Sequence, residues 1–328
     1  MNIGRRAALG GALAAIAGRA RAGGMIRLGL LHTLSPAPFY IAQARGFFAL
    51  AGVPVEFKFF DAAQPIAAAA VAGDIDVGVT ALTGGFFSLA GRGALKVIGG
   101  ALHEQKGFEA TAVLASKAAY AAGLTSIDKL GGHSLGITQY GSSFHYMVGR
   151  LAEITGFDAK SVTLRPLQTI GNMVAAVRTG QVDATIAVAS MARPVAESGE
   201  ARIIGWVGDL LPYQLTALFT TSKMIDTRPD DLRAFCGAYQ KGVAAYRAAF
   251  LDRTEADGAA IADIQTFILA SDPQAAAKIR ESVGWYDAGA ALDVGDVTHQ
   301  LAWFTAENMV KGNIDARDII DTRFLPTR

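Results

Sequence analysis

The sequence predicts a two-lobed α/β protein in which each lobe is a mixed sheet flanked by helices. The main observation is a repeated order of elements: a short apolar strand, a polar loop and a helix at 26–52 return at 134–156. Each copy then leads to a Gly-x-[Ile/Val]-Asp element, at Gly73 and Gly180, which are 107 residues apart (180 − 73). Two like-ordered units favour two similar lobes. After residue 228 the apolar spacing becomes helical, which predicts a helical tail on lobe one.

The first unit begins with the apolar residues 26–31, which are typical of a buried strand. Pro36 and Pro38 end this strand, and Pro38 suits the first turn of the helix that Gly52 terminates. The loop between them therefore follows the carboxyl end of a strand, where open α/β sheets bind ligands. The same lobe should contain further strands at 53–60, 75–81 and 95–99, and a polar exit at 101–107.

The second unit repeats this plan with a strand at 134–138, a polar loop at 139–143 and a helix that ends before Gly156. We expect the chain to cross between the lobes near 106–109 and again near 211–215. Lobe one would then comprise residues 25–107 plus 215–328, and lobe two residues 108–214. Two crossings of this kind allow the lobes to close around a ligand.

Composition limits the possible functions. Hydrophobic residues make up 51% and charged residues 18% of the chain, which describes a well-packed globular protein. Lys and Arg do not cluster among aromatic residues, so binding to nucleic acid is not expected. Cys236 is the one cysteine, so the chain has no internal disulfide.

Residues 1–24 are predicted to be a signal peptide of the twin-arginine type. Arg5 and Arg6 precede an apolar run that is too short to span a bilayer, and the small-residue site at 20–22 suggests cleavage near residue 22. The alternative is an amphipathic or core helix. The signal-peptide interpretation predicts a soluble protein in the periplasm.

The most specific candidate for a binding site is the loop Gly141-Ser142-Ser143 before the lobe-two helix. Glycine lets a ligand approach the backbone, the hydroxyls can donate, and a helix N-terminus favours an anion. The alternative is ordinary N-capping by one of the serines. Other candidates lie in matching loops or are aromatic residues near the cleft, with core packing as the alternative for the aromatics: His32, Thr33, Ser35, Phe39, Tyr40, Thr83, Tyr140, Phe144, Ser190 and Tyr213.

Catalytic and metal-binding patterns are not found in the sequence. The histidines lack metal-ligand spacing, and neither a Gly-x-Ser-x-Gly elbow nor a phosphate-binding loop is present. Cys236 lies on an apolar helix face and should be a buried, inert thiol. Asp76 and Asp183 precede strands at the wrong end of the sheet for a site, so capping or loop hydrogen bonding is expected of them. We therefore expect no cofactor, no metal and no catalytic residue.

Several motifs resemble those of one family. Pro38-Phe39-Tyr40 with Ala42, then Gly46-Phe47-Phe48, Gly52 and Val55, are similar to the first βα unit of periplasmic substrate-binding proteins of the nitrate, sulfonate and taurine type, which are related to proteins that bind thiamine pyrimidine precursors. The elements at 73–78, the Gly-Ser pair before the lobe-two helix and the closing IIDTRFLP also match. The resemblance implies a type II-like periplasmic-binding-protein fold that captures solute between its lobes.

The resemblance also implies function and site residues. Such a protein would be a monomer that delivers a small polar or anionic organic solute to an ABC permease and, indirectly, to its ATPase. The solute would meet Ser35 and Phe39 after strand one, Thr80 and Thr83 after strand three, and Gly141 to Ser143. The first loop reads HTLSPAPF, without the Trp and Asn-Pro-x-x-His of pyrimidine binders, and no arginine enters the proposed cleft. Sulfonate, nitrate and heteroaromatic solutes all remain open.

Two other functions are compatible with the same fold. One is an enzyme of the superfamily, such as a pyrimidine synthase or a desulfinase with a cysteine nucleophile, which would need a cysteine in the cleft. The other is a periplasmic input protein for a sensor, which would bind its ligand by the same physics.

Overall fold

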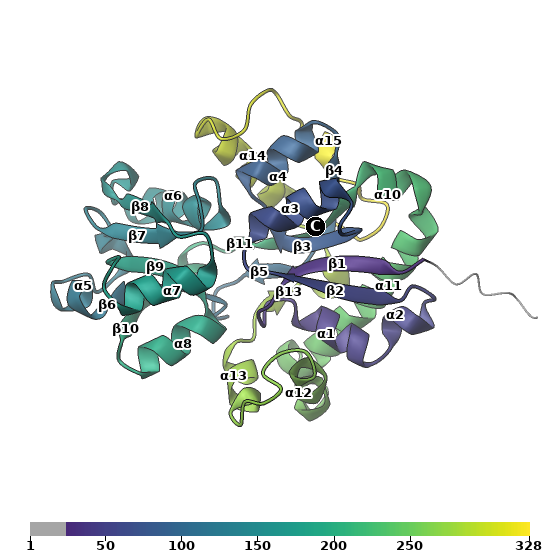
Figure 1. The fold of residues 1–328 in the computed structure, drawn as a ribbon, viewed down its shortest axis with the longest axis horizontal. Coiled ribbons are helices and arrows are strands. Elements are labelled where there is room, and N and C mark those ends of the chain that lie inside the picture. The colour runs from purple at the N-terminus through teal and green to yellow at the C-terminus, as the bar shows by residue number, and fades with distance from the viewer. Residues whose placement is uncertain (1–23) are drawn as a thin grey trace, which may run out of the picture.

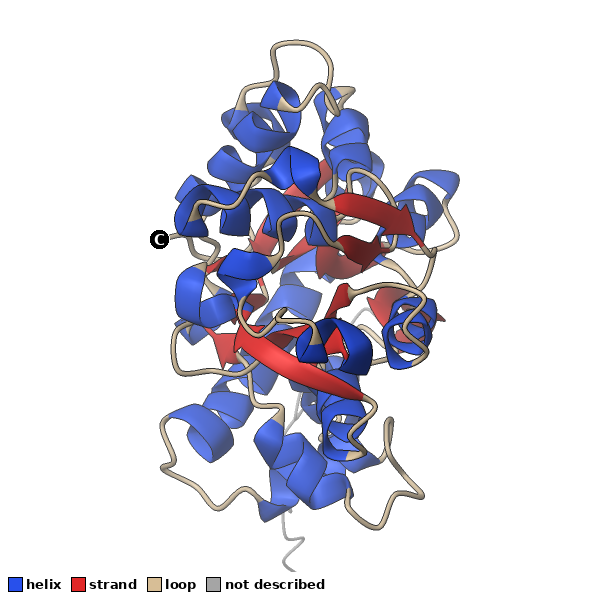
Figure 2. Ribbon diagram, turned by 90° about the vertical axis from the view of Figure 1, so that its left-hand side faces the viewer, coloured by secondary structure: helices blue, strands red, loops and turns tan. Residues whose placement is uncertain are grey.

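The computed structural model describes residues 24–328, so all of the predicted signal peptide except Gly24 lies outside the described residues. Two five-stranded sheets, each with helices against it, form two lobes side by side (Figure 1). Helices lie on either side of the strands (Figure 2). The predicted α/β fold with two mixed sheets is confirmed.

The lobe-one sheet has the strand order β2-β1-β3-β12-β4. Strands β1, β2 and β3 are parallel, and β12 runs antiparallel to both of its neighbours. The strands are β1 (Ile26–Leu31), β2 (Val55–Phe60), β3 (Val77–Ala81), β4 (Leu95–Gly100) and β12 (Thr216–Thr221), and the helices are α1 (Ala37–Ala44), α2 (Phe47–Leu50), α3 (Ala63–Ala72) and α4 (Gly84–Gly91).

The lobe-two sheet repeats this topology, with the order β8-β7-β9-β6-β10. Its first three strands are parallel, and β6 is antiparallel to β9 and β10. The strands are β6 (Thr111–Ser116), β7 (Ser134–Ile137), β8 (Thr163–Pro166), β9 (Ala184–Val188) and β10 (Ala201–Trp206), and the helices are α5 (Lys117–Ala121), α6 (Ser143–Thr155), α7 (Ile170–Arg178), α8 (Ala189–Glu197) and α9 (Val207–Leu210).

A small third sheet lies where the lobes meet. It consists of β5 (Leu102–Glu104) between β11 (Tyr213–Gln214) and β13 (Trp285–Tyr286). The sequence suggested a polar exit over 101–107, but Leu102, His103 and Glu104 are all buried. The difference arises because β5 is the central strand of a sheet and not an exposed loop, and its side chains project from the two faces of that sheet into the protein. We call this the hinge sheet.

The C-terminal part is helical, as its spacing predicts. The long helix α11 packs against α1 and α2 in lobe one, whereas α13 contacts α8 and α14 contacts α6, both in lobe two. The helices are α10 (Ser222–Thr227), α11 (Pro229–Tyr246), α12 (Gly258–Gln265), α13 (Ala275–Glu281), α14 (Val294–Ala306) and α15 (Ala316–Ile319). Among residues 24–328, no helix combines the length and the apolar character needed to cross a bilayer.

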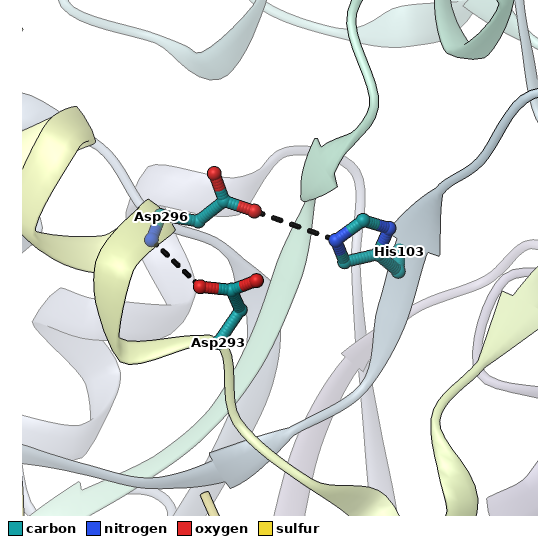
Figure 3. Close-up of side chains that lie close together, drawn as sticks. All are labelled: His103, Asp293 and Asp296. Atoms are coloured by element: carbon teal, nitrogen blue, oxygen red, sulfur yellow. Dashed lines mark hydrogen bonds and ion pairs between the residues drawn. The ribbon is translucent and has the colours of Figure 1, made fainter. Parts of the chain in front are cut away.

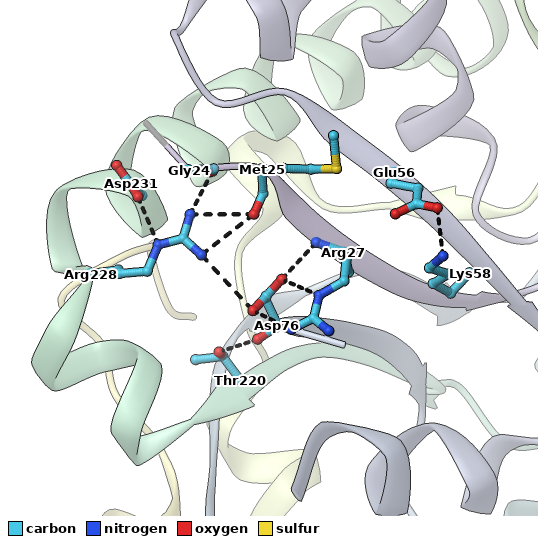
Figure 4. Close-up of polar contacts among 9 residues, drawn as sticks. All are labelled: Gly24, Met25, Arg27, Glu56, Lys58, Asp76, Thr220, Arg228 and Asp231. Carbon is cyan, nitrogen blue, oxygen red and sulfur yellow. Dashed lines mark hydrogen bonds and ion pairs between the residues drawn. The ribbon is translucent and has the colours of Figure 1, made fainter. Parts of the chain in front are cut away.

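The two aspartates of the repeated motif have a structural role, but they bond residues of a neighbouring strand, whereas the sequence predicted helix capping or loop hydrogen bonding. Asp76 accepts hydrogen bonds from the backbone and side chain of Arg27, and Arg228 lies beside the same carboxylate (Figure 4). In lobe two, Asp183 accepts from the backbone N–H and hydroxyl of Ser134. Burial alone would raise the pKa of Asp76, but the Arg27 hydrogen bonds outweigh it and hold this pKa below its usual range. Both aspartates tie a strand start to the neighbouring strand.

Candidate functional site

A cavity lies between the lobes and is lined by both. Its lobe-one wall includes Leu31, Ser35, Ala62, Ala63, Ala81, Leu215 and Thr216, and its lobe-two wall includes Thr111, Thr138, Ser143, Phe144, Met147, Ile170 and Val188. The space open to the centre of a water molecule is about 40 Å³. One water needs roughly 10–15 Å³ of such space, so the cavity in this structure has room for about three waters. Ser35 also lines two smaller cavities beside it.

The loop after β1 places Ser35 at the centre of these cavities. Its hydroxyl lies 2.6 Å from the Thr33 hydroxyl, and Tyr40 donates a hydrogen bond of 3.0 Å to the Thr33 carbonyl. From the hinge sheet, the Tyr286 hydroxyl donates to the carbonyl of Ser35. The loop is therefore held both by its own lobe and by the hinge.

The start of α6 forms the opposite wall. Ser142 is the N-cap, and its hydroxyl accepts from the backbone N–H of His145, while Ser143 and Phe144 line the cavity. Gly141 has a φ of +75°, which favours glycine, and its carbonyl accepts a hydrogen bond of 2.9 Å from the N–H of Gly84 in lobe one. This bond joins the lobes directly beside the cavity, and we call this arrangement of the lobes closed.

Three helices begin at the cavity wall. The N-terminal residues of α3, α6 and α7 that line it are Ala63, Ser143 and Ile170, and the three helices come from both lobes. First-turn N–H groups have no acceptor within their helix, and each N-terminus carries a partial positive charge. No Lys, Arg, Asp or Glu lines the cavity among residues 24–328. The field inside therefore favours a hydrogen-bond acceptor or an anion.

Two buried hydroxyls in these cavities have no hydrogen-bond partner among residues 24–328. Thr111 is 1% exposed and lines the main cavity, and Thr80 is 3% exposed and lines a smaller cavity next to Ser35. Buried polar groups are rarely left without a partner in native proteins. These hydroxyls are therefore candidate contacts to a bound molecule.

The structure brings five of the candidates named from the sequence to these cavities: Ser35, Thr80, Ser143, Phe144 and Ser190. Ser142 and Thr83 are instead N-caps, of α6 and α4. Gly141 contributes the contact between the lobes described above.

The remaining predicted residues lie elsewhere. Phe39 is in the lobe-one core, with its ring centroid 4.0 Å from that of Tyr239, and Tyr213 is buried beside Tyr146. His32 is exposed and packs on Phe59, and Tyr140 is 60% exposed. None of these four side chains lines the three cavities that share Ser35.

The apolar wall of the cavity was missed by sequence reasoning. Leu31, Met147, Ile170 and Leu215 lie at strand ends or on helices, where apolar residues normally signal core. Phe144, expected to be more a core residue than a contact, is 8% exposed and lines the cavity. Thr138 directly follows strand β7, and Thr111 is the first residue of strand β6. A hydroxyl at the end of a strand was the sequence signal that could have identified both as cavity residues.

A cluster of His103, Asp293 and Asp296 has the donor types of a cation site (Figure 3). His103 Nε2 lies 3.4 Å from an Asp296 oxygen. The guanidinium of Arg328 already sits in this cluster, 2.7 Å from His103 Nε2 and 3.2 Å from Asp293. This cation balances the carboxylates, so the cluster is explained as an ion-pair network between the hinge sheet, α14 and the C-terminal segment.

Cys236 does not take part in the site. It is 1% exposed on the face of α11 that packs into lobe one, and burial raises the pKa of its thiol. The thiolate, which is the nucleophilic form, is disfavoured there.

Comparisons with known proteins agree with this architecture. The family described as NMT1/THI5 like matches residues 34–249. Among solved structures, the alkanesulfonate-binding protein SsuA from Xanthomonas axonopodis pv. citri, bound to MOPS, has a TM-score of 0.72 at 17% identity and covers 91% of this chain and 98% of its own. No curated protein matches the chain.

Two further structures bear on the fold. A Candida albicans protein described as having the generic periplasmic binding protein fold has a TM-score of 0.70 at 15% identity, over 92% of this chain and 97% of its own. DszB, crystallised as a cysteine-to-serine mutant with biphenyl-2-sulfinic acid, has a TM-score of 0.57 at 12% identity, over 92% and 97%. At these identities the likeness shows the fold.

Proposed function

Because the chain belongs to the NMT1/THI5-like family, we propose that it is the extracytoplasmic solute-binding component of an ABC importer. In this proposal the protein acts as a monomer in the periplasm, residues 1–24 direct its export, and the lobes close on a small polar or anionic organic solute. Closure then presents the loaded protein to the permease, and no covalent bond changes.

The observation that carries the proposal is the cavity enclosed by both lobes. Hydroxyl groups of Ser35, Thr111 and Ser143 reach it from the two sides, together with the N-termini of three helices. A ligand held in this way bridges the lobes and stabilises the closed conformation, since it binds that state better than the open one.

The cavity wall also bears on the solute class. Hydroxyls and helix N-termini suit a sulfonate, a nitrate or the acceptor edge of a heteroaromatic ring. Leu31, Met147 and Leu215 offer apolar surface for the organic part of such a solute. The absence of a charged side chain from the wall, among the described residues, disfavours a cationic solute.

Two alternatives share the fold. An enzyme of the desulfinase or pyrimidine-synthase kind would need a nucleophile at the cavity, and Cys236 lies in the lobe-one core instead. The structural likeness to DszB keeps this alternative worth testing. A sensory input protein would bind solute in the same cavity but signal to a receptor.

A thermal-shift screen of the protein without residues 1–24 tests the proposal. The panel should contain sulfonates, nitrate, carboxylates and pyrimidines. A true ligand at 100 times its Kd adds about 2.7 kcal/mol of stability, and the shift must grow with concentration. Chemical turnover of a hit would instead support the enzyme alternative. Failure of every class to shift the melting temperature would count against solute capture in this cavity.

A further inference from the structure

A buried carboxyl group lies in the hinge sheet, just outside the cavity wall. Glu104 is the last residue of β5, and its side chain is 0% exposed. Neither carboxyl oxygen has a hydrogen-bond partner among residues 24–328. Glutamate is almost never fully buried without a partner, and burying an unpaired charge is costly. The position of this group therefore calls for a role beyond packing.

The groups that face Glu104 belong to lobe two and to the hinge. The Thr111 hydroxyl of β6 and the backbone N–H of Gly208 in α9 are near the carboxyl, but neither has the geometry of a hydrogen bond to it in this structure. A Cβ built on Gly208 would lie 3.1 Å from a Glu104 carboxyl oxygen, and the carboxylate of Asp209 adds negative charge nearby. Tyr213 of β11 is opposite Glu104 in the sheet register, and its buried hydroxyl also lacks a partner.

No cation faces this carboxyl among the described residues. Two further groups lie near Tyr213: the Tyr146 hydroxyl of α6, which is neutral, and the Asp296 carboxylate of α14, which is negative. His103, the neighbour of Glu104 in β5, points to the other face of the strand because side chains alternate, and Arg328 contacts His103 there. The surroundings thus favour the neutral, protonated carboxyl.

Thr111 connects Glu104 to the cavity. A hydroxyl has one proton to donate and two lone pairs to accept. A charged Glu104 can only accept, so it would draw the Thr111 proton away from the cavity. A protonated Glu104 can donate to the Thr111 oxygen, and the Thr111 proton is then free for a group inside the cavity.

We propose that Glu104 is a positioning residue that takes up a proton from water when the lobes close, and that this proton leaves the Thr111 hydroxyl as a donor to the solute. The inference rests on the proposed solute-binding function and adds a proton to the binding equilibrium. Opening would carry Thr111 and Gly208 away with lobe two and admit water to the carboxyl.

The direction of the pH effect follows from linkage. The pKa of Glu104 is raised to about 8 in the closed structure, chiefly by burial and to a smaller extent by Asp209, against the opposite effects of Thr111 and Gly208. In an open, hydrated hinge the pKa should return toward its ordinary 4.5. Between these two values the closed state holds the proton more tightly, so each pH unit weakens capture by up to about tenfold.

Calorimetric titration with ethanesulfonate, an anionic probe with a short apolar tail, tests directly whether the protein takes up a proton when it binds a solute. From pH 5.5 to pH 7.5 the wild-type affinity should fall by up to about 100-fold. Titrations at pH 7 in two buffers of different ionisation enthalpy should show close to one proton taken up per bound probe. Zero uptake would overturn the proposal.

Variants separate the role of Glu104 from general effects of pH. In Glu104→Gln the affinity should be nearly independent of pH and close to that of the wild type at pH 5.5, because the amide is neutral and can donate. The exposed Glu255→Gln is the matched control and should keep the wild-type dependence. Thr111→Val should bind the probe at least about tenfold more weakly, whereas Thr111→Ser, which keeps the hydroxyl, should bind nearly as well.

Urea unfolding with and without the probe distinguishes failure of this inference from failure of the proposed function. In the solute-free, open protein the pKa of Glu104 is near its ordinary 4.5, so the midpoints of the wild type and Glu104→Gln should depend on pH alike between pH 5.5 and 7.5. At a fixed excess of probe, the midpoint of the wild type should fall over this range and that of Glu104→Gln should not. Probe binding with the same pH dependence in both proteins would reject this inference and keep solute capture. No stabilisation of either protein by the probe at pH 5.5 would reject sulfonate capture, and this inference with it.

Discussion

At the scale of single residues, two adjacent serines in one loop have different roles. Ser142 accepts from the N–H of His145 and caps α6, whereas Ser143 lines the cavity. The backbone turn at Gly141, with a φ of +75°, separates the loop from the helix and brings the cap into place. Capping therefore supports α6, and the neighbouring hydroxyl remains available to solute.

Alanine substitutions of the two serines should have different effects, one on solute binding and the other on stability. Ser143→Ala should weaken solute binding by about tenfold or more, since a hydrogen bond to a charged group contributes roughly 1.5–3 kcal/mol, and should change stability little. Ser142→Ala should lower the free energy of unfolding by about 1 kcal/mol through loss of the cap. Calorimetry and urea unfolding measure the two effects. If Ser142→Ala lost the binding and Ser143→Ala kept it, the assignment of the cavity wall would be wrong.

Sequence patterns predicted part of this site and missed part of it for a physical reason. A hydroxyl after a strand, as in Ser35, or at a helix start, as in Ser143, has few structural uses, so its position carries information. An apolar residue such as Met147 looks the same whether its side chain meets the core or a cavity. Phe39 shows the converse, because its stacking on Tyr239, 200 residues away in the chain (239 − 39), is a tertiary contact that local pattern does not encode.

At the scale of elements, the repeated motif produces the same joint in both sheets. Asp76 binds Arg27 at the start of β1, and Asp183 binds Ser134 at the start of β7, each across a separation of 49 residues. The repeated spacing predicted equivalent positions for the two aspartates but not this joint, because the strand that each one bonds is set by the sheet order and not by local sequence. Its chemistry differs, because Asp76 pairs with two arginines, whereas Asp183 bonds mainly a neutral serine.

This difference predicts unequal losses when each aspartate is neutralised. Asp76→Asn should cost about 2 kcal/mol of unfolding free energy at pH 7, because its 16%-exposed side chain pairs with arginine. Asp183→Asn should cost about 1 kcal/mol or less, because that side chain is 42% exposed and screened by water. Urea unfolding of both variants and the wild type measures these costs.

The pH dependence provides a control for the same pair. Both aspartates have lowered pKa values, despite a desolvation effect that raises them. Their contribution is therefore present above the unfolded-state pKa and is lost as pH falls through the folded-state pKa. The gap between wild type and Asp76→Asn should shrink at pH 3 and below. A gap of equal size at pH 7 and at that pH would show that the ion pair is not its cause.

At the scale of the whole molecule, the C-terminal helices complete the contact between the lobes. Their amphipathic spacing predicted helices but did not identify the surface that each one covers, since an apolar stripe packs on any matching face. In the structure the Trp303 ring of α14 lies at 5.6 Å from the His145 ring and 5.3 Å from the Tyr146 ring, both on α6. This contact and the bond from Gly84 to Gly141 both reach lobe two from other parts of the chain.

Adding one methyl group at Gly149 tests the contact between α14 and α6. A Cβ on Gly149 of α6 would lie 2.3 Å from Trp303, so Gly149→Ala should push α14 away and favour the open state. At a solute concentration near the wild-type Kd, scattering should then show a larger radius of gyration for the variant than for the wild type. Solute affinity should fall in proportion to the closed fraction. Gly237→Ala in α11 is the matched control, because nothing lies within 4 Å of its added Cβ; it should stabilise the helix by up to about 1 kcal/mol and leave both measurements unchanged. Wild-type radius and affinity in Gly149→Ala would mean that closure depends on the cavity and the hinge alone.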